Sequence, residues 1–255
     1  MNITILGAGN VATQLALGLR KAGHSIVQIF NRSDNAGQEL ARAVGASFTS
    51  DARSLQNADV YIIAVKDDAI ADVASLLKAG DKIVVHTSGT KTKDLLSFCS
   101  ANYGIFYPLQ TMTKLSKVDF SNVPVLIEGN NEATLQLLET LARSLSKQTH
   151  KVTEEQRQWI HVAAVFANNF TNHLFAVSEE ILTMHGLDFE ILKPLIFRSI
   201  ENLREHSPAV LQTGPAARRD KLTIERHLAL LEQHKNFQEL YRLLSDSITA
   251  TQSKR

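Results

Sequence analysis

A glycine loop between a strand and a helix constrains this chain more than any other feature. Gly7, Gly9 and Ala12 form a G-x-G-x-x-A pattern that separates a β-branched run from an apolar helical stretch. In this position the first glycine permits a tight turn, the second lets a pyrophosphate approach, and the alanine lets the helix pack closely. The helix N-terminus at Asn10 and Val11 would offer its N–H groups to the anion. The pattern predicts a dinucleotide-binding βαβ unit; the alternative is a tight turn without a ligand.

Short β-branched strands alternate with helical stretches over roughly the first 150 residues. The run from Val60 to Val65 is apolar throughout, as expected of a strand that helices cover on both faces. This alternation predicts an α/β fold with a doubly wound, mostly parallel Rossmann sheet. We expect strands at 3–6, 25–30, 60–65, 82–86, 104–107 and 123–127, and helices at 11–22, 35–44, 68–77 and 132–145.

From Thr153 to the end of the chain only helical periodicity is found. Thr153 and Gln156 have the spacing of a capping box, and the helix that they open is expected to continue to about Met184. We therefore divide the chain into a Rossmann domain, residues 1–152, and an all-α C-terminal domain, residues 153–255.

The composition excludes several classes of function. Lys and Arg number 27 and Asp and Glu 26, so the basic excess of nucleic-acid-binding proteins is missing. A single cysteine, Cys99, and nine histidines without a His-Glu-x-x-His spacing predict no metal site. No apolar run approaches the roughly 18 residues of a membrane span. The first residues lack a basic leader, so we expect a cytoplasmic location.

The end of the second predicted strand bears on the choice of cofactor. An NAD site has Asp or Glu there to accept from the ribose 2′-OH, whereas this chain has Asn31, Arg32 and Ser33. No acid would repel a 2′-phosphate, which the Arg32 guanidinium could bind while Asn31 and Ser33 add neutral donors. The segment therefore predicts NADP(H) over NAD(H); the alternative is that Arg32 is a solvated surface residue.

Two later strands also end in polar residues. Val65 and Lys66 follow one strand, and His86, Thr87 and Ser88 end the next. Ligands of open α/β sheets lie outside the carboxyl ends of the strands, so we expect Val65, Lys66 and Thr87 to contact the cofactor. Ser88 is a candidate to hydrogen-bond the nicotinamide carboxamide or the substrate, as is Thr87. His86 is either catalytic or bonded to the backbone.

A polar stripe marks the first helix of the C-terminal half. At 100° per residue His161, Val165, Asn168 and Asn172 fall on one face, and Asn169 lies beside it. The surrounding residues are apolar, so we expect this helix to be buried on most sides. Asn168 and Asn169 are candidates to polarise a substrate carbonyl or imine, and His161 to relay a proton. Alternatively the amides bond other helices or a dimer mate.

Two adjacent arginines follow a Gly-Pro turn later in the helical half. Arg218 and Arg219 could bind a substrate carboxylate or simply pair with Asp220, since exposed ion pairs are common.

The segments Gly7–Ala12, Asn31–Ser33 and 58–66 resemble the cofactor domain of the pyrroline-5-carboxylate reductase family. A fuller match is to a related family of Rossmann-like proteins with an uncharacterised helical C-terminal domain. This match is carried by residues 86–89, 107–111, 163–174, 213–220 and 227–231. The resemblance implies a helical domain of the 6-phosphogluconate dehydrogenase C-terminal type, which is usually buried in a homodimer.

Related hydroxyacid reductases carry Lys-x-x-x-Asn on the long helix. The match retains Asn169 but puts Val165 in place of the lysine, which disfavours hydroxyacid chemistry unless His161 takes the role of the lysine. Tyr107 also precedes Pro108 where many relatives have His-Pro. We therefore expect an NADP-dependent oxidoreductase that transfers a hydride between the nicotinamide and a small imine or keto compound in the interdomain cleft. The alternative is a non-catalytic NADP-binding sensor or scaffold.

Overall fold

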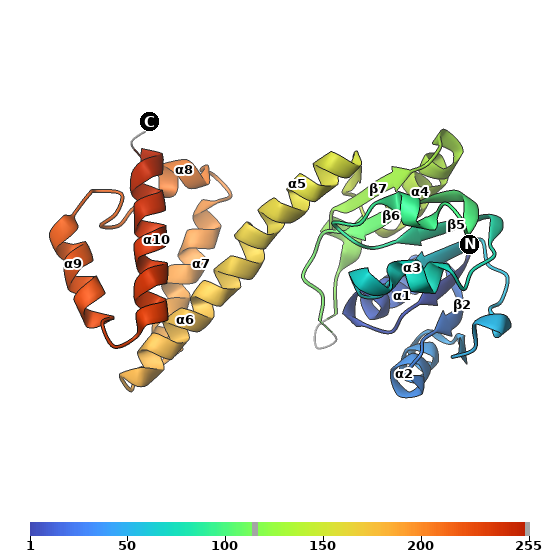
Figure 1. The fold of residues 1–255 in the computed structure, drawn as a ribbon, viewed down its shortest axis with the longest axis horizontal. Coiled ribbons are helices and arrows are strands. Elements are labelled where there is room, and N and C mark those ends of the chain that lie inside the picture. The colour runs from blue at the N-terminus through green and yellow to red at the C-terminus, as the bar shows by residue number, and fades with distance from the viewer. Residues whose placement is uncertain (114–116, 253–255) are drawn as a thin grey trace. The chain divides into compact units, whose positions relative to one another are not determined.

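The structure is a computed structural model that describes residues 1–113 and 117–252 (Figure 1). It contains two compact units, Met1–Ala167 and Asn168–Arg255. The mixed α/β structure ends with strand β8, Thr149–Lys151, and the regular elements described after it are all helical. The first turns of the long helix after β8 belong to the same compact unit as the sheet.

The first unit is built on one eight-stranded sheet with the order β3-β2-β1-β4-β5-β6-β7-β8. All neighbouring strands are parallel except β6 and β7. The doubly wound, mostly parallel Rossmann sheet is therefore confirmed. The strands are β1 Asn2–Leu6, β2 Ser25–Phe30, β3 Ser47–Thr49, β4 Val60–Ile63, β5 Gly80–His86, β6 Ser100–Pro108, β7 Val125–Gly129 and β8.

Helices cover both faces of this sheet, and the all-α second half is also confirmed. The first unit contains α1 Asn10–Lys21, α2 Asp34–Val44, α3 Ile70–Ala74, α4 Glu132–Leu145 and α5 Glu154–Ala164. The second contains α6 Thr171–Met184, α7 Lys193–Asn202, α8 Pro208–Leu211, α9 Lys221–Leu230 and α10 Lys235–Gln252.

The alternation of side chains along each strand divides the core of the first unit into two layers. In β4, Val60 and Ile62 pack with the apolar residues of α1, α2 and α4. Tyr61 and Ile63 point the other way and pack with α3. Because successive residues face opposite sides of a sheet and both sides are covered, the strand is apolar throughout.

Several elements differ from the sequence-based expectation. The helix expected at 68–77 is confined to α3, which follows a 3-10 turn, and β6 begins four residues earlier than expected. The short strands β3 and β8 were not predicted. Each has three residues, too few for periodicity to be recognised, and each lies at an edge of the sheet.

The long helix begins as the sequence predicts. The Thr153 hydroxyl accepts from the Gln156 N–H, and the Gln156 side chain accepts from the Thr153 N–H, which completes the capping box. Between α5 and α6, however, residues Val165–Phe170 form a π-helical turn. Because i→i+5 bonding places more residues in each turn, the stripe calculated at 100° per residue does not hold across this segment.

The expectation that this helix is buried on most sides is wrong for the single chain. Trp159 is 67% exposed and Phe166 is 65% exposed. A helix that is apolar on nearly all sides suits burial against another surface, and the single chain supplies too little of that surface.

Within the part of the chain that the structure describes, no helix has the length and apolar character needed to cross a membrane. No group of three or more metal-ligating side chains comes together among the same residues.

Candidate functional site

The glycine loop between β1 and α1 has the shape that close approach of a ligand requires. Gly7 has φ +124°, and a Cβ atom there would lie 2.3 Å from the carbonyl oxygen of Ala64. A side chain is therefore excluded at Gly7 by the fold itself. A Cβ atom at Gly9, in contrast, would meet no other atom within 4 Å. Gly9 is also the N-cap of α1 and offers no side-chain cap, so its helix N-terminus is open to an anion.

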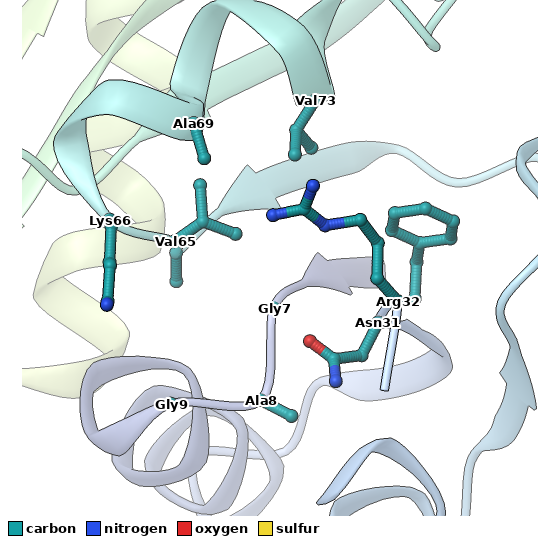
Figure 2. A pocket seen from close by; sticks show the side chains of 11 residues that line it. Gly7, Ala8, Gly9, Asn31, Arg32, Val65, Lys66, Ala69 and Val73 are labelled. Atoms are coloured by element: carbon teal, nitrogen blue, oxygen red, sulfur yellow. The ribbon is translucent and has the colours of Figure 1, made fainter. Parts of the chain in front are cut away.

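A pocket of about 310 Å³ lies in front of this loop (Figure 2). Its walls are the residues that follow β1, β2 and β4, at the point where the strand order reverses. Six residues predicted to bind the cofactor line it: Gly7, Gly9, Asn31, Arg32, Val65 and Lys66. The predicted residues Asn10 and Val11 form the first turn of α1, directly after the loop.

Two cationic side chains, Arg32 and Lys66, belong to the described residues that line the pocket. Figure 2 shows the Arg32 side chain extended across the pocket towards Val73. No carboxylate belongs to the described residues that line the pocket. Asn31 donates from its side-chain amide to the carbonyl of Ser33 at 2.7 Å, which fixes the turn, and Ser33 is the N-cap of α2. The turn therefore presents a guanidinium to the pocket without a competing acid.

His86, at the end of β5, is held by the backbone. It is completely buried, and its Nδ1 accepts from the Ser88 N–H at 3.2 Å. With that nitrogen as acceptor, Nε2–H donates to the Thr92 carbonyl at 3.1 Å. Burial lowers the pKa of His86 to about 4, so the ring is neutral near pH 7. Of the two interpretations of His86, the structure shows the backbone-bonded one.

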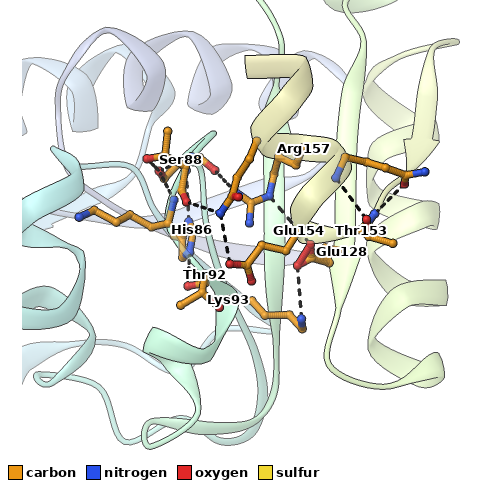
Figure 3. Close-up of polar contacts among 12 residues, drawn as sticks. His86, Ser88, Thr92, Lys93, Glu128, Thr153, Glu154 and Arg157 are labelled. Carbon is orange, nitrogen blue, oxygen red and sulfur yellow. Dashed lines mark hydrogen bonds and ion pairs between the residues drawn. The ribbon is translucent and has the colours of Figure 1, made fainter. Parts of the chain in front are cut away.

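The Ser88 hydroxyl is fully engaged in hydrogen bonds, to its own loop and to Asp67 after β4 (Figure 3). It donates to the Asp67 carboxylate at 2.9 Å and accepts from the N–H groups of Thr90 and Lys91, each at 3.1 Å. Asp67 directly follows Lys66, which lines the pocket, so the bond from Ser88 connects the pocket wall to the loop after β5. Thr87, half-buried, begins this loop, and its N–H donates to the β4 residue Ile63 at 3.2 Å.

A buried arginine joins α5 to the same loop. Arg157 has no exposed surface, and it donates to the Ser88 carbonyl at 3.2 Å (Figure 3). Its Nε lies 4.0 Å from Glu128 Oε1, and Lys93 lies 3.4 Å from the other oxygen of that carboxylate. Burial lowers the pKa of Arg157, and Glu128 opposes this effect. This cluster holds α5 against the sheet and places a positive charge behind the loop.

Next to this cluster, Tyr107 meets His161. The Tyr107 hydroxyl lies 3.0 Å from His161 Nδ1, and the two rings pack edge to face with centroids 6.0 Å apart. A Cβ atom on Gly89 would lie only 2.5 Å from His161 Nδ1, so the pair packs directly on the loop after β5. His161 therefore stands at the carboxyl ends of β5 and β6.

The remaining candidates lie in the second unit. Asn168 and Asn169 belong to the π-helical turn, and both are exposed. Arg218 and Arg219 are also exposed, whereas Asp220 caps α9 by accepting from the Thr223 N–H and hydroxyl. These bonds to Thr223, and more weakly the charge of Arg218, lower the pKa of Asp220.

Sequence reasoning missed three contributors to this site. Gly89 and Tyr107 have no predicted role in the sequence-based site, and Arg157 is absent from it. Arg157 lies one helical turn before His161, so the two share a face of α5. That spacing is a signal that could have revealed it.

Comparisons with known proteins agree with this description. Residues 2–89 match the family model described as NADP oxidoreductase, coenzyme F420-dependent, and residues 123–248 match a domain of unknown function, DUF2520. A presumed NADP oxidoreductase from Bacteroides fragilis is 37% identical, with a TM-score of 0.91 and 98% of each chain covered. No curated protein matches the chain significantly.

More distant structures share the fold. A pyrroline-5-carboxylate reductase from Streptococcus pyogenes is 15% identical, with a TM-score of 0.65 and 98% of each chain covered. An imine reductase from Myxococcus stipitatus in complex with NADP⁺ is also 15% identical, with a TM-score of 0.64, covering 100% of this chain and 93% of that one. The chain therefore belongs to the family of oxidoreductases that join an NADP-oxidoreductase Rossmann domain to a helical DUF2520 domain.

Proposed function

We propose that this protein is an NADP-dependent oxidoreductase that interconverts a small imine or keto compound and its reduced form. The observation that carries the proposal is the pocket at the strand ends, where Arg32 reaches across a space that contains no carboxylate among its described lining residues. A 2′-phosphate would there meet a guanidinium and no negative side chain.

The residues around the pocket fit a dinucleotide. Gly9 leaves open space beside the uncapped N-terminus of α1, as a pyrophosphate requires. Val65 and Lys66 form the opposite wall, and Arg32 with its neighbours Asn31 and Ser33 suits the adenosine end. When bound, such a dinucleotide supplies the hydride for reduction or accepts it in the reverse direction.

In this proposal the reacting end lies at the loop after β5. Thr87 contacts the nicotinamide, while Ser88 keeps the loop in shape through its bonds to Asp67, Thr90 and Lys91. His161, whose ring packs against Gly89, is suited to exchange a proton with the substrate. Asn168 and Asn169 stay sequence-based candidates for donors to the substrate carbonyl or imine.

The choice of an imine or keto compound has two supports. Structures with the same fold include pyrroline-5-carboxylate reductases and imine reductases. The chain also has Val165 where hydroxyacid-reducing relatives are expected to have lysine, so a histidine rather than an ammonium group would handle the proton.

The proposal includes a homodimer joined through the helical unit. Among the described residues after 167, the only buried apolar side chain is that of Ala216. Leu195, Phe197 and Leu230 are at least 60% exposed. A helical unit with so little core of its own is expected to share one with a second copy. We also place the protein in the cytoplasm, where a free cysteine such as Cys99 stays reduced.

Consumption of NADPH tests the reaction. The purified protein is incubated with NADPH and a panel of cyclic imines and 2-keto acids, and we expect turnover with at least one compound. His161→Gln should lower kcat by about a hundredfold or more, since general acid catalysis contributes about that much. The exposed His150→Gln serves as the matched control. Tight NADPH binding without turnover on any compound would favour a sensor or scaffold instead.

A further inference from the structure

We propose that Tyr107 is a positioning residue that acts through His161. Its hydroxyl donates to His161 Nδ1, so that Nε2 carries the proton that His161 delivers to the substrate. This inference rests on the proposed function, because it assigns the source of the proton for that reaction.

The contacts of the pair leave little freedom to either ring. The hydroxyl-to-Nδ1 distance of 3.0 Å is that of a hydrogen bond, and the edge-to-face contact orients the imidazole. On another side, Gly89 packs so closely that a Cβ atom there would lie 2.5 Å from Nδ1 and 3.1 Å from Tyr107 Cζ. Both rings are therefore held against the loop after β5.

The charges around Tyr107 favour the hydroxyl as the donor. Burial raises the pKa of Tyr107, so the phenol keeps its proton, and the positive charge of Arg157 opposes that rise. Because the Arg157 charge opposes the effect of burial on the pKa, the phenol stays a stronger hydrogen-bond donor than burial alone would leave it. The carboxylate of Asp67 acts in the opposite sense, but hydrogen bonds from Ser88 and Thr90 already engage it.

This arrangement allows a balanced proton transfer. As the substrate carbon accepts its hydride, the electron pair of the double bond moves to nitrogen or oxygen, which takes the proton from His161 Nε2. The Tyr107 proton then moves to Nδ1 and restores a neutral imidazole. Water then protonates Nε2, and Nδ1 returns its proton to the phenolate, whose negative charge Arg157 stabilises in the meantime, so both residues regain their starting forms.

Steady-state kinetics with NADPH and 2-methyl-1-pyrroline test the role of the hydroxyl. Tyr107→Phe keeps the ring and should lower kcat at least about tenfold, with the KM for NADPH and the melting temperature unchanged. Tyr103→Phe is the matched control, because Tyr103 lies on the same strand and its hydroxyl faces Asp94 at 3.4 Å. A wild-type kcat for Tyr107→Phe would overturn the proposal.

A second variant disturbs the same pair from its other side. Gly89→Ala should displace the His161 ring and reproduce the loss in kcat, and the double variant Gly89→Ala/Tyr107→Phe should be no slower than the slower single variant. Losses that simply multiply would show that the two residues act independently, which contradicts the proposal.

Nitrogen NMR of the histidine-labelled protein provides a readout that requires no substrate. We expect the neutral His161 ring to carry its proton on Nε2 and to accept a hydrogen bond at Nδ1. In Tyr107→Phe the Nδ1 resonance should move towards that of free imidazole. A proton on Nδ1 would overturn the proposal. If the wild-type protein turned over no imine or keto compound, the proposed function would fail, while this spectrum would still decide how Tyr107 and His161 are bonded.

Discussion

Two histidines at the carboxyl ends of the sheet have different environments. Both nitrogens of His86 are bonded within its own loop, and the ring is completely buried. His161 is partly exposed and meets a hydroxyl. The sequence places both residues near the site because strand ends and helix faces follow from periodicity. It does not distinguish them, because the partners of His86 come from its own loop, whose path has no periodic signal.

The burial of His86 makes the stability of the protein depend on pH. Its pKa is lowered to about 4 in the folded state, against 6.5 in the unfolded chain. Between these values the unfolded chain binds the extra proton, so stability is lost as the pH falls from about 6.5 towards 4. This pKa shift corresponds to a decrease of about 3 kcal/mol in the free energy of unfolding. Urea unfolding at pH 7.5 and pH 4.5 measures it.

A pair of variants isolates this effect from the other titrating groups. His86→Gln should be less stable than the wild-type protein at pH 7.5 but lose less stability at pH 4.5. His150→Gln, at an exposed position on β8, should keep the wild-type dependence. An unchanged pH dependence in His86→Gln would show that His86 is not the group responsible.

At the scale of elements, the β1–α1 turn separates a glycine needed for folding from one needed for binding. Gly7→Ala would force a Cβ atom against the Ala64 carbonyl oxygen, so we expect a fall in melting temperature. Gly9→Val has open space and ordinary backbone angles, so it should melt like the wild-type protein but bind NADPH at least about tenfold more weakly. Wild-type NADPH affinity in a folded Gly9→Val would show that the turn serves the fold alone.

The elements that the sequence predicts well are those with strong local signals. The ends of β2 and of α4 are as predicted, and so is the capping box at Thr153. The π-helical turn at Val165–Phe170 was not predicted, because hydrophobic periodicity is calculated for a regular helix. The cluster of Arg157, Glu128 and Lys93 was missed for another reason, since it joins three separate elements.

At the scale of the molecule, we expect the second unit to need a partner. Many of its large apolar side chains are exposed in the single chain, and among the described residues none is buried, which would cost far more than its helices gain from their caps. We expect sedimentation to show a dimer with twice the 28.2 kDa mass of the chain. We also expect the melting temperature to rise with protein concentration.

One substitution at the expected interface, with its control, sharpens this prediction. Leu195→Asp puts a charge on an α7 side chain that is 65% exposed, and it should weaken the dimer and lower the melting temperature. Leu137→Asp, at a 46% exposed position on α4 of the first unit, should leave both unchanged. A stable monomer at all concentrations would contradict the dimer.

The most direct test of the account is a calorimetric titration of the wild-type protein with NADPH and with NADH. We predict at least about tenfold tighter binding of NADPH, since a hydrogen bond to a charged group contributes about 1.5–3 kcal/mol. Arg32→Ala should remove most of this preference and leave the NADH affinity unchanged. Arg42→Ala, at an exposed position on α2 outside the pocket, should keep it. Equal affinities of the wild-type protein for NADPH and NADH would contradict the account.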